Sequence, residues 1–269
     1  MTSSDLLKER VTPAWFDEAK LGIFVHWNPA AIPGFAPRRN LREMPDDPEM
    51  IKTWRRLPYA EMYQNTLNVP GSLTAEYHKA RYGDQTYDDF VATFRDEMIP
   101  KWDPNPIADL IAQSGARYSV MYTKMEDGFV PYPTAHPNPF KERWASERDV
   151  VGELADAVRA RGVRFGVGFS GGMDWTFPGD LPLRKFDSVT RTMHYDEQYR
   201  EYTVAHLREM IDRYKPEVLW NDWSLPPGTD LVSLFTYYFE NVPEGVVNNR
   251  FDPPPFRDMT THTGDVYAD

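Results

Sequence analysis

The chain has 269 residues, with 30 Lys and Arg, 41 Asp and Glu and no Cys, so its formal charge is −11. The absence of Cys excludes a disulfide scaffold, a thiolate metal site and a Cys nucleophile. The acidic balance argues against a nucleic-acid or anionic-membrane partner, because both need a basic surface on the protein.

No apolar run is long enough to span a bilayer; the run at residues 22–27 is among the longest. The first ten residues contain no hydrophobic segment of the kind found in secretory signals. We therefore expect a cytoplasmic protein with no membrane partner.

Short apolar runs alternate with amphipathic segments along the chain. The apolar runs predict strands, and the amphipathic segments predict helices, two of which end at Gly115 and Gly162 as C-caps. In chain order the predicted elements are strand 22–27, helix 107–114, strand 118–123, helix 149–161, strand 163–170, helix 199–214, strand 218–222, helix 231–240 and strand 245–250.

This alternation indicates βα units around a parallel sheet, and we predict an α/β fold of the TIM-like (β/α) barrel type. Residues 28–113 are long for one unit, and two further helices are predicted there, at 58–66 and 87–94. We interpret this stretch as an insertion rather than a domain of its own. The whole chain, 1–269, is therefore predicted to be one catalytic domain.

Five strand patterns are fewer than the eight of a complete barrel. A barrel without three of its strands would expose sheet edges and part of its core. We therefore expect the chain to be the N-terminal portion of a barrel that is incomplete at its C-terminus.

Aromatic residues make up 14% of the sequence, with 8 Trp and 15 Tyr. Rings beside carboxylates suit a carbohydrate cleft, because the C–H faces of a sugar pack on rings while its hydroxyls bond to charged groups. A large aromatic core without a ligand would give the same composition. Composition alone leaves both interpretations open.

Polar residues follow the predicted strands at the edge where a parallel sheet usually carries its chemistry. His26 follows the first strand, Glu126 the second, and Arg250 the fifth, while Asp222 closes the fourth. A carboxylate in the place of Asp222 suits a glycosidase nucleophile, although Asp is also a common N-cap of the following helix. His26 is equally compatible with a ligand contact and with a satisfied core histidine.

Metal-dependent hydrolysis is a weaker alternative. His26, Glu126 and Asp222 lie at neighbouring strand ends, but the six His residues show no metal-binding spacing. We therefore predict no metal and no organic cofactor.

Several segments of the chain resemble family 29 of the glycoside hydrolases, the α-L-fucosidases. They occur in family order and run from about residue 11 to the end of the chain. The segments are 15–27 (WFDEAKLGIFVHW), 59–63 (YAEMY), 123–129 (TKMEDGF), 148–154 (RDVVGEL), 164–175 (RFGVGFSGGMDW) and 214–222 (YKPEVLWND).

The resemblance implies a retaining α-L-fucosidase with a barrel domain that acts on a carbohydrate. In relatives this domain is usually followed by a β-sandwich, which we expect to be absent from this chain. The family nucleophile corresponds to Asp222. Residues implied to contact the sugar are His26, Glu61, Trp220 and Arg250.

The sequence departs from the family pattern around the expected sugar pocket. Met125 and Glu126 stand where the family has two sugar-binding histidines, Met62 replaces a Trp, and Gly168 or Phe169 replaces a Tyr. Met125, Glu126 and Phe169 therefore complete the predicted substrate-binding set. Either the pocket is rebuilt for fucose or a related sugar, or the protein is a carbohydrate-binding paralogue without turnover.

The general acid/base of the family lies in a Thr-Pro-Glu-Tyr-like block, which this chain lacks. Retaining hydrolysis needs a second carboxyl group beside the nucleophile. Glu126, Asp265 and Asp269 are the candidates that the sequence offers, and truncation before the usual block is the interpretation we favour.

Overall fold

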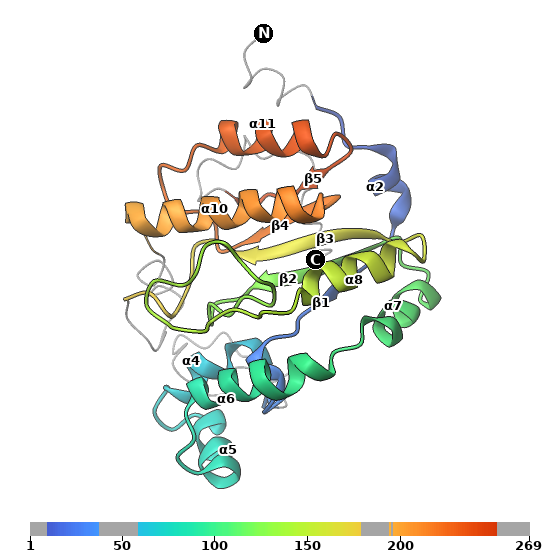
Figure 1. Cartoon of the computed structure of the whole chain (residues 1–269). Helices are drawn as coiled ribbons and strands as arrows, with labels where there is room; N and C mark the ends of the chain where they lie inside the picture. Colours follow the sequence, from blue (N-terminus) through green and yellow to red (C-terminus); the bar gives the residue numbers. More distant parts are fainter. Residues whose placement is uncertain (1–9, 38–58, 179–193, 195, 252–269) are drawn as a thin grey trace, which may run out of the picture.

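The computed structural model describes residues 10–37, 59–178, 194 and 196–251 (Figure 1). Within these ranges one sheet contains five strands in the order β1-β2-β3-β4-β5, and every neighbouring pair is parallel. The strands are β1 (Gly22–Val25), β2 (Tyr118–Lys124), β3 (Arg164–Ser170), β4 (Val218–Asp222) and β5 (Val246–Val247). Strand order that follows chain order is the arrangement of a barrel wall, and the predicted α/β class is confirmed.

A long helix lies in each connection between successive strands. Figure 1 shows α8 across β2 and β3, with α7 on one side and α10, then α11, on the other. The helices are α7 (Pro104–Gln113), α8 (Val150–Arg159), α10 (Glu197–Tyr214) and α11 (Leu231–Asn241). Each begins after an Asp whose side chain accepts a backbone N–H of the first turn, which is favourable N-capping; these are Asp103, Asp149, Asp196 and Asp230.

The connection after β1 contains a separate group of short helices, seen below the sheet in Figure 1. The two predicted helices are present, but α5 was not predicted, because it has only a weak apolar face. Ser72 caps α5 by accepting from the Ala75 N–H. The group comprises η1 (Pro29–Ala31), η3 (Ala60–Met62), α4 (Tyr63–Leu67), α5 (Leu73–Tyr82), α6 (Tyr87–Thr93), the π-helical turn η4 (Phe94–Met98) and η5 (Ile99–Lys101).

Side chains alternate between the two faces of the sheet and so form two apolar clusters. The larger cluster lies between the sheet and its helices and includes Phe165, Val167 and Phe169 of β3. The smaller cluster lies on the opposite face, where α2 (Ala14–Ala19) contributes Trp15 and Phe16. When a strand residue belongs to the larger cluster, the residues directly before and after it point to the opposite face of the sheet.

The fifth strand is shorter than predicted. After Val247, the side chain of Asn248 takes the place of strand backbone: it accepts from the Asn221 N–H at 3.0 Å and donates to the Asn221 carbonyl at 2.9 Å. The first strand likewise ends at Val25, which releases His26 from the sheet. Across the described ranges, no helix has the length and apolarity that crossing a membrane requires.

Candidate active site

Asp222 lies at the carboxyl end of β4 and is the centre of the polar cluster there. Its side chain is 23% exposed, and Arg250 donates from Nη1 to Asp222 Oδ1 at 2.7 Å. The Arg250 guanidinium also lies 5.8 Å from the ring centroid of Trp220, two residues earlier on the same face of the strand. Asp222, Arg250 and Trp220, all predicted site residues, therefore lie together at the end of β4.

Asp222 does not cap the following helix, so that alternative is wrong. The cap of α11 is Asp230, whose Oδ1 accepts from the Ser233 N–H at 2.9 Å. The Asp222 carboxylate instead bonds to groups of the site.

His26 brings a second strand end to the cluster. Its ring lies 4.3 Å from the ring of Tyr122, measured between centroids. Protein atoms around the ring displace water, which disfavours the charged imidazole and lowers the pKa of His26. The negative charges of Glu61 and Asp222 act in the opposite direction but do not reverse this shift. The imidazole is therefore largely neutral near pH 7 and can both donate and accept hydrogen bonds. Glu61 therefore acts on His26 through its charge.

Tyr122 is a site residue that the sequence analysis missed. Tyr122 lies on β2, which β3 separates from β4, and its hydroxyl donates to Asp222 Oδ2 at 3.4 Å. A Cβ on Gly168 would come within 2.9 Å of the Tyr122 ring, so only glycine leaves room for it. Gly168 inside an apolar strand was the available signal, since such a glycine often marks a close approach.

Glu126 is buried beside Asp222 rather than open to the cleft. Its side chain accepts from Trp223 Nε1 at 2.5 Å and from Ser170 Oγ at 3.4 Å, both at Oε1. Burial, and to a smaller extent the negative charge of Asp222, raise the pKa of Glu126 to about 7. The residue is only 4% exposed. Glu126 therefore joins the site, but its bonds go to protein groups.

Phe169 is a wrong prediction of a substrate contact. It has no exposed surface and lies on the helix-covered face, 4.8 Å from Lys124 Nζ. The register pairs Phe169 with Asn221, whereas Gly168 pairs with Trp220 and Ser170 with Asp222. A shift of one residue along a strand reverses the face. Met125 is also 4% exposed, which leaves almost no surface for a ligand.

Two buried charged residues, Lys124 and Asp127, flank Met125 and Glu126 in the chain. Lys124 Nζ lies 3.3 Å from Asp174 Oδ2, and neither side chain is exposed. Asp127 Oδ2 accepts from Tyr87 OH at 2.7 Å and from Asn28 Nδ2 at 2.9 Å. Burial raises the pKa of Asp127 to about 6.

Other predicted groups do not add to the site that is described. Asp265 and Asp269 lie outside the described residues. His26, Glu126 and Asp222 do not form a ligand set, and the described part of the chain contains no group of three or more His, Asp or Glu placed to hold a metal ion.

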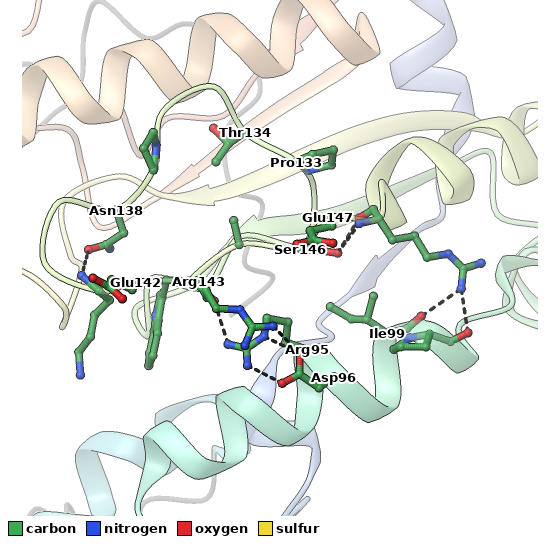
Figure 2. A pocket seen from close by; sticks show the side chains of 16 residues that line it. Arg95, Asp96, Ile99, Pro133, Thr134, Asn138, Glu142, Arg143, Ser146 and Glu147 are labelled. Carbon is green, nitrogen blue, oxygen red and sulfur yellow. Dashed lines mark hydrogen bonds and ion pairs between the residues drawn. The ribbon is translucent and has the colours of Figure 1, made fainter.

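A separate cavity of about 880 Å³ lies between the η4 and η5 region and the loop that follows β2 (Figure 2). Its lining contains none of the predicted site residues. The four cations that line it each have an acidic partner: Arg95 and Arg143 with Asp96, Lys141 with Asp88, and Arg148 with Glu153. The cations of this cavity are therefore paired, and the predicted site residues lie elsewhere.

A family model described as alpha-L-fucosidase matches residues 2–265. The chain belongs to the alpha-L-fucosidase family. Tissue alpha-L-fucosidases of Mus musculus and Bos taurus are 28% and 29% identical to it, over 97% of this chain and 52% and 50% of theirs. The chain thus spans about half the length of the curated relatives it matches.

Solved structures of the family agree with the fold. The Thermotoga maritima alpha-fucosidase in complex with fucose is 38% identical, with a TM-score of 0.81 over 93% of this chain and 56% of that one. A Thermotoga maritima alpha-L-fucosynthase gives a TM-score of 0.83 at the same identity, over 93% of this chain and 57% of that one. The described strands and helices are therefore part of a (β/α) barrel, as predicted.

Proposed function

We propose that this protein is a retaining α-L-fucosidase that cleaves terminal α-L-fucosyl linkages, or those of a closely related sugar, through Asp222. The observation that carries the proposal is the placement of Asp222: a half-buried carboxylate at a strand end, bonded to Arg250 at 2.7 Å. Family membership and the fucose complex of a structural relative support the choice of sugar.

In this proposal Asp222 attacks the anomeric carbon, the glycosidic bond breaks and a covalent glycosyl-enzyme forms. Arg250 and Tyr122 hold the two carboxylate oxygens during the attack. The face of Trp220 packs against the sugar ring, and His26 and Glu61 bond to its hydroxyls. Water then attacks the intermediate, and the configuration is retained.

A second carboxyl group has to protonate the leaving oxygen and later activate water. The raised pKa of Glu126, about 7, is that of a general acid at neutral pH. However, Trp223 occupies Oε1 of Glu126, and Oε2 is buried without a hydrogen-bond partner. We therefore assign the acid/base role to a carboxyl group outside the described residues, with Asp265 and Asp269 as the candidates in this chain.

The altered pocket favours one competing function. Met125 and Glu126, which replace the family histidines, are both buried. A site that loses polar partners of its substrate loses a large factor in activity. The competing function is therefore a carbohydrate-binding paralogue with no turnover. Neither function implies a cofactor, and the expected cytoplasmic location stays a prediction.

Hydrolysis of aryl α-L-fucosides by the wild type and by Asp222→Gly tests the proposal. We expect at least a 10³-fold loss of turnover in the variant and partial rescue by azide, which replaces the missing nucleophile and yields a fucosyl azide. Asp230→Gly is the matched control, because Gly in place of an N-cap Asp has a small effect. Activity of Asp222→Gly within tenfold of wild type would remove Asp222 from the mechanism. A wild type that binds fucose without hydrolysing any fucoside would establish the competing function.

A further inference from the structure

The residue directly after Asp222 has an unusual backbone conformation. Trp223 has φ 64° and Ser224 has φ 55°, so two successive non-glycine residues lie in the left-handed region. Bulky side chains adopt this region rarely, and such residues tend to occur where surrounding contacts hold them at functional sites.

Two hydrogen bonds of Trp223 connect Asp222 to Glu126. The backbone N–H of Trp223 donates to Asp222 Oδ1 at 3.1 Å, and its indole N–H donates to Glu126 Oε1 at 2.5 Å. Glu126 comes from the loop after β2, while Asp222 ends β4. These hydrogen bonds therefore cross the end of β3 and join two loops. Glu126 and Trp223 are 97 residues apart in the chain.

The surroundings fit this turn closely. A Cβ on Gly171 would lie 2.9 Å from the Ser224 carbonyl oxygen and 2.4 Å from Leu225, so glycine is needed at the contact with β3. The Gly171 N–H donates to the Asp222 carbonyl at 2.9 Å, and the Leu225 N–H donates to the Phe251 carbonyl at 2.9 Å. Backbone contacts thus fix both ends of the turn, and the Glu126 bond fixes its one large side chain.

We propose that Glu126 is a positioning residue that acts through Trp223 to orient the Asp222 carboxylate. The proposal rests on the proposed fucosidase function. Glu126 stands at one of the two positions where the family pattern has a sugar-binding histidine. In this chain the residue at that position accepts a hydrogen bond from Trp223, next to the proposed nucleophile, instead of binding the sugar. With Arg250 and the Trp223 amide on Oδ1 and Tyr122 on Oδ2, the carboxylate is restrained at both oxygens.

Kinetics of four variants on aryl α-L-fucosides test the role: Glu126→Gln, Glu126→Leu, Trp223→Phe and the control Trp102→Phe. Misplacement of a reacting group by about 1 Å can cost roughly 10²-fold in rate. We expect Glu126→Leu and Trp223→Phe each to lower kcat by about this factor, with little change in KM and equally for good and poor leaving groups. Their double variant should lose no more than either alone.

Glu126→Gln separates positioning from acid catalysis. Its amide oxygen can still accept from the indole N–H, so we expect kcat within about threefold of wild type and an unchanged pH profile. A loss confined to poor leaving groups, with the basic limb of the pH profile removed, would make Glu126 the general acid and overturn the proposal. A rise in KM without loss of kcat would make it a sugar contact, which also overturns the proposal.

The Trp102→Phe control removes an indole N–H that has no partner within the described structure, and it should keep wild-type kinetics. The Trp223 indole proton, observed by NMR of ¹⁵N-indole-labelled protein, reports the hydrogen bond without turnover; its signal should shift in Glu126→Gln. An unshifted signal, or wild-type kinetics of Trp223→Phe in an active enzyme, would overturn the positioning role alone. A wild type that hydrolyses no fucoside would overturn the proposed function itself.

Discussion

The ring of Tyr122 on β2 packs directly against Gly168 on β3, with ring carbons 2.9 to 3.1 Å from where a Cβ of residue 168 would be. This contact places the Tyr122 hydroxyl 3.4 Å from Asp222 Oδ2. The family pattern has a Tyr near the end of the third strand, and this chain has Gly168 or Phe169 there. A tyrosine hydroxyl nevertheless bonds to Asp222, but it comes from β2, the strand next to β3.

Gly168→Ala should therefore displace the Tyr122 ring and weaken its contact with Asp222. We expect a fall in kcat similar to that of Tyr122→Phe, on the order of tenfold, since one hydrogen bond to a charged group is worth about 1.5–3 kcal/mol. The inserted methyl should also cost roughly 1–3 kcal/mol of stability through overpacking. Steady-state kinetics and urea denaturation measure the two effects. Fully additive losses in Gly168→Ala with Tyr122→Phe would show that the glycine does not act through the tyrosine.

Removal of the Arg250 guanidinium should impair the nucleophile. Arg250→Met leaves Asp222 Oδ1 without its 2.7 Å cationic donor. We expect kcat/KM to fall by roughly 10- to 10²-fold, from the energy of one charged hydrogen bond. Arg250→Lys should be intermediate, because an ammonium keeps the charge but lacks the planar fork.

Free guanidinium ion should restore part of the activity of Arg250→Ala at concentrations far below those that unfold the protein. Arg164→Met is a matched control, because Arg164 begins β3, at the end opposite to the strand ends of the site, and pairs at 3.3 Å with a Glu244 side chain that is 68% exposed. An equal loss in both Met variants would mean that the Arg250 effect is not specific to the site.

The buried carboxyl of Glu126 should make stability depend on pH. Burial, aided by the charge of Asp222, raises its folded-state pKa from 4.5 to about 7. The folded state then binds more protons than the unfolded state between these values, so this group lowers stability as pH rises from 4.5 to 7. Glu126→Gln lacks this penalty. The free energy of unfolding of the variant minus that of the wild type should therefore increase from pH 5 to pH 8, by on the order of 3 kcal/mol.

Urea denaturation of the wild type and Glu126→Gln at pH 5 and pH 8 measures this difference. Asp127 has its pKa raised to about 6 by burial and contributes in the same direction, but it does so in both proteins. A difference in stability that does not change with pH would contradict the prediction.

The buried pair of Lys124 and Asp174 should matter far more for stability than a surface pair. Lys124 and Asp174 are fully buried with Nζ and Oδ2 3.3 Å apart. Lys124→Met leaves the Asp174 charge uncompensated in the interior, and we expect a loss of about 3–5 kcal/mol in urea denaturation. Lys79→Met removes a pair whose side chains are 71% and 94% exposed, and should change the stability little, because solvent screens exposed pairs. Comparable losses would contradict the buried character of the first pair.

The order of strands and helices was predictable from the sequence, because each element carries its own local signal. Short apolar runs predict the strands, and amphipathic segments, two of them ended by a glycine C-cap, predict the helices. The same signals place His26, Asp222 and Arg250 at one edge of the sheet. Helix α5 was missed because its apolar face is weak. The assignment of residues 1–269 to one domain stays a prediction.

Which side chains meet at that edge depends on the tertiary structure. Phe169 and Gly168 differ by one position, and the register of β3 against β4 puts the first in the core and the second beneath Tyr122. Glu126 and Trp223 are 97 residues apart, and no local pattern relates them. The amino-acid sequence was enough to predict which segments form strands and helices and in which order, because periodicity is local. The ends of β1 and β5 and the partners of Asp222 depend on strand register and on contacts between loops, which form only when the sheet assembles.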